Sequence, residues 1–318
     1  MTEIPPRSPV VGDAAARRLR TLSLLACFGM ALAFGLTFPA QKAALNFLPP
    51  LTVTALRNLF AVAALWPFWR RWRRRGGEAI PWRRLWPLLL LEPGLYYACE
   101  AYGVRLGSAG TAALLIGAIP VEVLLLQILL GRHRARLLDF MLLGVSLGGA
   151  ALVAGMGGFS GGGSANARLA ALLMFGASSC AALYVVISEG LRPRPHPLTL
   201  TFAQCLAGAV IFVPLALSFE PAARAPREWP LPALGATLFL GLGGSLLAYL
   251  LWNYALRHRP GRQVALFSNL VPVVGVAGGA LLLHERLRSA VFFGGALILA
   301  AAVLAVWLDE IPPVAETA

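Results

Sequence analysis

The sequence predicts an all-α membrane protein with ten transmembrane helices, arranged as two inverted five-helix repeats. Three observations support this fold class. The 318 residues are 58% hydrophobic and only 13% charged, long apolar stretches recur along the chain, and two gapless internal matches relate its halves. A composition this apolar excludes a water-soluble globular enzyme and a disordered chain. Four cysteines are too few for a disulfide-stabilised scaffold.

Apolar stretches of about 20 residues, the length that crosses a bilayer, are bounded by clusters of Arg, Pro and Gly. The predicted segments are 21–40, 51–69, 85–104, 108–131, 136–156, 168–189, 198–218, 232–256, 262–283 and 289–308. Hydrocarbon offers no partner to backbone polar groups, so each segment is predicted to be a helix. Strands of a membrane β-barrel would alternate polar and apolar residues, and these stretches do not. Because nine further segments follow the first, we interpret it as an uncleaved helix rather than a signal peptide.

Basic residues lie in the gaps between these segments. The formal net charge is +13, and all 27 basic residues except Lys42 are arginine. They do not form the continuous basic stripe on a folded face that nucleic-acid binding needs, so we expect no nucleic-acid partner. On alternate sides of the ten-helix arrangement they number 19 and seven, with Arg57 inside the second segment. The positive-inside rule then places both termini in the cytoplasm, and the Arg-, Ala-, Gly- and Pro-rich composition indicates a bacterial inner membrane.

The two halves of the chain match one another without gaps. At an offset of 147 the coinciding residues include Pro50, Thr52, Thr54 and Pro67 with Pro197, Thr199, Thr201 and Pro214. At an offset of 152 they include Tyr102, Arg105, Pro120 and Arg134 with Tyr254, Arg257, Pro272 and Arg286. Five is an odd number of crossings, so the second copy must run through the membrane in the opposite sense to the first. Inverted repeats are typical of alternating-access transporters, although a duplication retained only for packing would give the same matches.

The matches define the domain organisation. The predicted parts are a cytoplasmic tail at 1–20, a first repeat at 21–156, a Gly-rich external linker at 157–167, a second repeat at 168–308 and a cytoplasmic tail at 309–318. The glycine-rich stretch lacks the Gly-Lys-Ser/Thr ending of a phosphate-binding loop, so it predicts no nucleotide site. No soluble domain remains to house ordinary enzymology, and we expect no enzyme activity, no cofactor and no metal site.

Several short motifs resemble a known family. They are Phe34-Gly35-Leu36-Thr37-Phe38-Pro39, Pro50 with Leu56-Arg57-Asn58, Leu251-Trp252-Asn253-Tyr254-Ala255-Leu256, Asn269-Leu270-Val271-Pro272-Val273 and His284-Glu285-Arg286-Leu287. In this order they resemble the EamA-type branch of the drug/metabolite transporter superfamily over residues 21 to 308. A glutamate that relatives carry after the fourth helix is absent here, where Arg132-His133-Arg134 stands. The resemblance implies a ten-helix exporter of small metabolites, often amino acids, with a cavity formed by helices 1, 3, 4, 6, 8 and 9.

Three glutamates lie within the apolar segments. Burying a carboxylate at membrane depth costs about 2.5–3.5 kcal/mol or more, so Glu92, Glu100 and Glu122 are predicted to serve function. Glu92 and Glu122 fall at similar depths, about 10–14 Å from the cytoplasmic side. A carboxyl group in apolar surroundings can exchange a proton near neutral pH, which makes Glu122 first and Glu100 second the proton-coupling candidates. The alternative is a structural ion pair between Glu100 and Arg57 or Arg105.

Aromatic and polar residues recur at helical spacing beside these acids. The remaining predicted cavity residues are Phe34, Tyr96, Tyr97, Ser245, Tyr249, Trp252 and Asn269. Such a face could stack on an apolar substrate or hold an ammonium group by cation–π contact, while Trp252 could equally anchor the headgroup layer. Pro120 and Pro272 each free a backbone carbonyl four residues earlier, and we expect helix bends there, either for rocking or as static kinks.

These features predict a secondary transporter that exports a small metabolite, an amino acid or a related amphipathic solute, by alternating access with proton coupling. Its partners would be the solute and the lipid bilayer, with a monomer as one oligomeric option and the Gly275/Gly279 spacing as a close helix contact or a dimer face. One alternative is a carrier of sugar-linked or nucleotide-linked solutes, which would need fixed cations in the cavity. Another is a membrane-embedded structural subunit or enzyme.

Overall fold

The computed structural model describes residues 13–132, 136–155, 165–188, 190–191, 194–225, 229–259, 264, 267–285 and 289–308. The predicted linker at 157–167 and both predicted tails therefore lie largely outside the described residues. Within the described ranges all regular structure is helical. The helices of the first half are α1 (Asp13–Leu45), α2 (Pro50–Arg74), α3 (Trp82–Leu89), the π-helical η1 (Leu90–Leu95), α4 (Tyr96–Leu106), α5 (Ala109–Ile116), α6 (Ile119–Leu129) and α7 (Leu137–Gly155). Those of the second half are α8 (Ala165–Ser188), α9 (Pro197–Phe219), the short 3₁₀ turn η2 (Pro221–Arg224), α10 (Leu231–Phe239), the π-helical η4 (Leu240–Ala248), α11 (Tyr249–His258), α13 (Leu270–Leu283) and α14 (Ser289–Leu308).

Many of these helices have the length and composition of membrane spans. Six helical stretches are long and apolar enough to cross a bilayer: Arg17–Leu45, Pro50–Arg74, Ala109–Leu129, Ala165–Ser188, Pro197–Phe219 and Leu231–His258. Three shorter apolar helices are Leu137–Val153, Leu270–Leu283 and Val291–Leu304. The prediction of an all-α, multi-pass membrane protein is confirmed. The exact number of crossings and the inversion of the repeats remain predictions.

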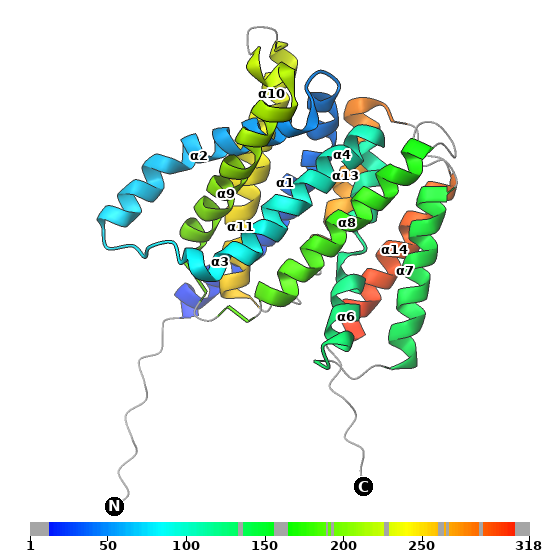
Figure 1. Ribbon diagram of the computed structural model, residues 1–318. Helices are drawn as coiled ribbons and strands as arrows, with labels where there is room; N and C mark the ends of the chain where they lie inside the picture. The colour runs from blue at the N-terminus through cyan, green and yellow to red at the C-terminus, as the bar shows by residue number, and fades with distance from the viewer. Residues whose placement is uncertain are drawn as a thin grey trace, which may run out of the picture.

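Helices from the two halves pack side by side. α2 packs on α9, α7 on α14, α1 on α13 and α4 on α8. In Figure 1, α7 and α14 lie together at one edge of the bundle, and α2 reaches toward the opposite edge. Since every one of these pairs joins residues of the first half to residues of the second, the two halves share one core.

Close helix approach depends on small residues. A Cβ atom on Gly275 of α13 would lie 2.4 Å from the Cβ of Ala113 on α5, and 3.4 Å from the Gly35 carbonyl oxygen on α1. Any side chain at Gly275 would therefore push α13 away from α5. This glycine serves a contact within the chain.

At one end of the bundle, a carboxylate and an amine bind the turn between α4 and α5. Glu285 accepts hydrogen bonds from the backbone N–H of Ala109 at 2.8 Å and of Gly110 at 3.0 Å, where α5 begins. Lys42, in the last turn of α1, donates to the Val104, Arg105 and Gly107 carbonyl oxygens where α4 ends. Negative charge at a helix N-terminus and positive charge at a C-terminus are both stabilised by the helix dipole.

A second carboxylate binds a helix start at the same end of the bundle. Glu220, which is only 7% exposed, accepts from the N–H of Leu51 at 2.9 Å and from both the N–H and the hydroxyl of Thr52 at 2.7 Å, where α2 begins. Arg105 donates to the carbonyl oxygens of Leu45 and Leu48. We call the region formed by residues 45–52, 104–110, Glu220 and Glu285 the capped end.

Candidate functional site

A cavity of about 240 Å³ lies among the helices. Its wall includes residues of α1, α2, η1, α4, α6, α8, α11 and α13. Gln127, Ser188 and Leu256 belong to it and lie near the ends of α6, α8 and α11, and Arg194 follows α8. These residues lie at the end of the bundle opposite the capped end, and we call them the cavity mouth.

A buried ion pair forms part of the cavity wall. Nη1 of Arg57 lies 3.4 Å from Oε2 of Glu100, and both side chains are 4% exposed. The guanidinium also donates from Nε to the Ser245 hydroxyl at 3.0 Å and lies over the Tyr97 ring, 4.1 Å from its centre. Tyr96 donates its hydroxyl to Oε1 of Glu100 at 3.1 Å. Hydrogen bonds from polar neighbours offset part of the cost of burying such a pair, and Ser245 and Tyr96 provide them here.

A glycine makes room for this pair. A Cβ atom on Gly244 would lie 2.5 Å from Cγ2 of Thr37 and 3.1 Å from Nη2 of Arg57. η4 therefore carries no side chain at the point where it passes α1 and the guanidinium. Substitution of Gly244 would displace Arg57 or Thr37.

Glu92 reaches the cavity from a break in a helix. Its backbone has φ −139° and ψ 112°, which is not helical, and Pro93 follows it. The residue before a proline is driven toward this extended conformation because the proline ring clashes with an α-helical predecessor. Oε1 of Glu92 accepts a hydrogen bond of 2.6 Å from the Tyr249 hydroxyl. Among the described residues Glu92 has no ion-pair partner.

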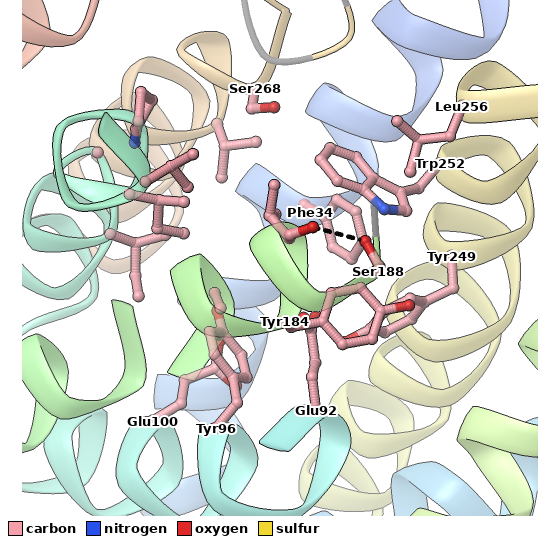
Figure 2. Close-up of a pocket in the computed structure, with 18 of the residues that line it drawn as sticks. Phe34, Glu92, Tyr96, Glu100, Tyr184, Ser188, Tyr249, Trp252, Leu256 and Ser268 are labelled. Carbon is pink, nitrogen blue, oxygen red and sulfur yellow. Dashed lines mark hydrogen bonds between the residues drawn. The ribbon is translucent and has the colours of Figure 1, made fainter. Parts of the chain in front are cut away.

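Aromatic rings line the space next to Glu92. Phe34 packs edge-on against Tyr249, with ring centres 5.2 Å apart, and against Trp252 at 6.4 Å. Tyr97 lies 6.4 Å from Tyr249. Figure 2 shows Phe34, Tyr249 and Trp252 gathered on one side of the cavity, with Glu92 below them. The site thus combines a carboxyl group with several π faces, a combination that suits an organic cation.

Two interrupted helices form another part of the wall. α5 ends at Ile116 and α6 begins at Ile119, just before Pro120, while α13 begins at Leu270, just before Pro272. A Cβ atom on Gly117 would lie 3.0 Å from Cγ of Pro272, so the two interruptions are in contact. Sequence analysis predicted helix bends at both prolines, and the interruptions lie there.

Most of the predicted site residues line this cavity. They are Phe34, Glu92, Tyr96, Tyr97, Glu100, Pro120, Tyr249, Trp252 and Asn269. Ser245 lies behind them, hydrogen-bonded to Arg57 and 3.3 Å from the Tyr97 hydroxyl. Pro272 supports Gly117 from outside the cavity wall.

Glu122 is placed differently. It does not belong to the cavity wall. Its carboxyl group accepts a 2.5 Å hydrogen bond from the Ser178 hydroxyl, which joins α6 to α8. The expectation that Glu92 and Glu122 share one cavity is therefore not met, because the side chain of Glu122 is directed to the packed face of α8. Of the two ion-pair alternatives for Glu100, Arg57 is the partner, while Arg105 binds backbone carbonyls at the capped end.

Several cavity residues were missed. Thr37, Gln127, Tyr184, Ser188 and Arg194 carry polar groups in the wall. Tyr184 could have been found as a hydroxyl inside an apolar segment, whereas Gln127, Ser188 and Arg194 lie near predicted helix ends, where polar residues are ordinary. The described residues contain no group of three metal-ligating side chains.

Comparisons with known proteins agree on the kind of molecule. The family model described as EamA-like transporter family matches residues 21–155 and again 168–307. A protein of Archaeoglobus fulgidus named "Uncharacterized transporter" is 26% identical over 274 residues, covering 84% of this chain and 92% of its own. "Uncharacterized transporter YcxC" of Bacillus subtilis is 25% identical, covering 84% and 87%. A solved crystal structure aligns with TM-score 0.64 and 20% identity over 91% of this chain and 99% of its own, which supports the fold.

Proposed function

The chain belongs to the EamA-like transporter family, and on that premise we propose that it is a secondary transporter that exports an amino acid or a related amphipathic solute by alternating access. The observation that carries this proposal is Glu92 in the cavity wall, held by Tyr249 and surrounded by Phe34 and Trp252. Arg57 compensates Glu100, so Glu92 is the carboxyl group of the cavity that is available to an ammonium group. The solute's apolar part would lie against the aromatic rings.

The position of the cavity mouth supports the proposed direction of transport. The excess of basic residues, 19 against seven, favours a bacterial inner membrane protein with both termini in the cytoplasm. α1 begins at the same end of the bundle as the cavity mouth, and it ends at the capped end. In this conformation a solute would reach the cavity from the cytoplasm, as export requires.

Helix contacts support two inverted repeats, 21–156 and 168–308, joined by the external linker 157–167. Contacts of α1 with α13 and α11 are matched by contacts of α8 with α6 and α4, as exchange of the two halves requires. In the pairs α2 with α9 and α7 with α14, each helix is the counterpart of its partner, so exchange of the halves leaves both pairs unchanged.

Helix capping has the same reciprocity. Glu220, after α9, binds the start of α2, and Glu78, after α2, accepts a hydrogen bond from the N–H of His196, directly before α9. Two halves related in this way can exchange conformations, which is the basis of alternating access.

Proton coupling is the second part of the proposal. Glu122 and Glu100 are the candidates, and their partners differ: a neutral serine hydroxyl for Glu122 and a guanidinium for Glu100. A carboxyl group bound to neutral hydroxyls can be neutralised by a proton without leaving an unpaired cation, whereas protonation of Glu100 would leave Arg57 without its counter-charge. This difference keeps Glu122 first.

The test is solute uptake into proteoliposomes with and without a pH gradient, using amino acids, amines and a nucleotide-linked sugar. Glu92→Gln should abolish uptake of amine-bearing solutes under both conditions, because it removes the charge that binds the ammonium group. Glu122→Gln should retain downhill transport and lose the response to the gradient. Transport of the nucleotide-linked sugar alone would overturn the solute class, and an unchanged gradient response in Glu122→Gln would overturn its coupling role.

A further inference from the structure

Asn269 has a buried amide nitrogen without a partner among the described residues. The residue is 7% exposed, belongs to the cavity wall, and within the described part of the chain its Nδ2 has no hydrogen-bond partner. A buried donor without a partner costs about 1–3 kcal/mol. In a cavity that holds a ligand, the ligand can supply the missing acceptor.

The position of Asn269 makes the unused amide unusual. It stands directly before α13, at the N-cap position, where asparagine commonly binds the first backbone N–H groups of the helix with its side chain. Here the side chain makes no capping hydrogen bond. The amide therefore serves neither the helix nor a neighbouring side chain, and capping does not explain its burial.

The surrounding backbone favours negative charge. α13 has 14 residues and begins in the cavity wall beside Asn269, with no acidic residue in its first turn, whereas the first turn of α6 already carries the Glu122 carboxylate. The N-terminus of a helix is the positive end of its dipole, and interrupted helices in transporters commonly direct such ends toward anionic groups of the substrate. Glu92 and Glu100 lie on η1 and α4, in another part of the wall, and their carboxylates would repel an anion there.

We propose that Asn269 donates a hydrogen bond from Nδ2 to a carboxylate of the transported solute, next to the start of α13. This inference rests on the proposed function, because the solute's ammonium group is assigned to Glu92. It adds a specificity-determining residue: simple amines would satisfy Glu92 and leave the Asn269 amide unpaired. Amino acids would satisfy both.

Three probes separate these contributions. Phenylalanine, phenylalaninamide and phenethylamine share a phenyl group and an ammonium group, and carry respectively a carboxylate, a neutral carbonyl and neither. Equilibrium binding to the purified full-length protein should give phenylalanine an affinity about tenfold above that of phenethylamine, with phenylalaninamide between them. Asn269→Asp keeps the side-chain shape and replaces the donor by a carboxylate, which repels the carboxylate of phenylalanine and attracts the ammonium group of phenethylamine, so the advantage of phenylalanine should disappear or reverse. Asn269→Ala should reduce the same advantage without adding charge.

Thr199→Val provides the matched control. The Thr199 hydroxyl is also buried without a partner, but it lies outside the cavity wall. This variant should retain the full preference for phenylalanine.

Equal binding of phenylalanine and phenethylamine to the unaltered protein would overturn the role of Asn269 and leave the amine site at Glu92 intact. An equal loss of all three probes in both Asn269 variants would show a structural role and overturn the proposal as well. Failure of every probe to bind the unaltered protein would reject the proposed solute class, and this inference with it.

Discussion

The capped end and the cavity mouth differ in how many hydrogen bonds charged side chains make to helix ends. At the capped end Glu285 and Glu220 bind backbone N–H groups of α5 and α2, and Lys42 binds the last carbonyls of α4. At the cavity mouth, Arg194 is exposed and donates to one carbonyl oxygen, that of Leu256. The capped end is therefore fixed by more charged contacts at helix ends than the cavity mouth.

The sequence itself carries part of this asymmetry. At the offset of 152 that relates the second part of each repeat, the position matching Glu285 is His133, which has no carboxylate. His133 lies outside the described residues. A histidine cannot bind two backbone N–H groups as the Glu285 carboxylate does. The first half thus has no counterpart of the carboxylate with which the second half binds the start of α5.

The largest effect should come from the ion pair that separates the two regions. Arg57→Met would leave Glu100 buried without a counter-charge, which costs about 3–5 kcal/mol of stability. The measurement is thermal unfolding of the purified protein in detergent. The double variant Arg57→Met/Glu100→Gln removes both charges and should recover most of the loss. A double variant as unstable as the single one would show that the guanidinium acts through packing on Tyr97 instead.

A smaller effect is expected at the capped end, from Glu285→Gln. The amide keeps one acceptor oxygen and loses the charge, so the bonds to Ala109 and Gly110 weaken by about 1–2 kcal/mol in total. Hydrogen exchange measured by mass spectrometry should speed up roughly tenfold in residues 107–113 and remain unchanged in 50–54.

Glu220→Gln is the matched control for this prediction, because Glu220 binds the other helix start of the capped end. It should reverse the pattern, with faster exchange in 50–54 and no change in 107–113. Equal acceleration of both segments in either variant would mean that the capped end opens as one unit, and would contradict independent caps.

The sequence predicts the fold more completely than the candidate site. Apolar length predicted a multi-pass helical protein because hydrocarbon leaves the backbone no other solution. Helical spacing placed Glu92, Tyr96 and Glu100 on one face, and all three line the cavity. Pro120 and Pro272 marked the helix interruptions for the same local reason, since proline cannot donate to the preceding turn.

Spacing along one helix says nothing about the neighbouring helix, and the remaining site features depend on neighbours. Glu122 and Glu92 are both glutamates within apolar segments. Glu92 lines the cavity, whereas Glu122 lies against α8 and binds Ser178. The capping by Glu285 joins residues 176 positions apart, and no periodic pattern predicts such a contact. The extended backbone at Glu92 could have been predicted from Pro93, because a residue before proline disfavours the helical conformation.

The smallest effect should come from the carboxylate that corresponds to Glu220 at the other end of α2. Glu78 is exposed and accepts from one N–H, that of His196, whereas Glu220 is buried and accepts from two N–H groups and a hydroxyl. Glu78→Gln should change stability by no more than about 0.5 kcal/mol, because water replaces an exposed acceptor readily. In addition, α9 has a cap of its own that does not involve Glu78. Burial lowers the pKa of His196, so its ring is neutral at pH 7, and Nδ1 accepts a hydrogen bond from the Leu198 N–H. The measurement is the same thermal unfolding, with Glu220→Gln alongside. A loss in Glu78→Gln equal to that in Glu220→Gln would mean that the two ends of α2 are equally fixed, and the contrast between capped end and cavity mouth would then have to rest on Glu285 and Lys42 alone.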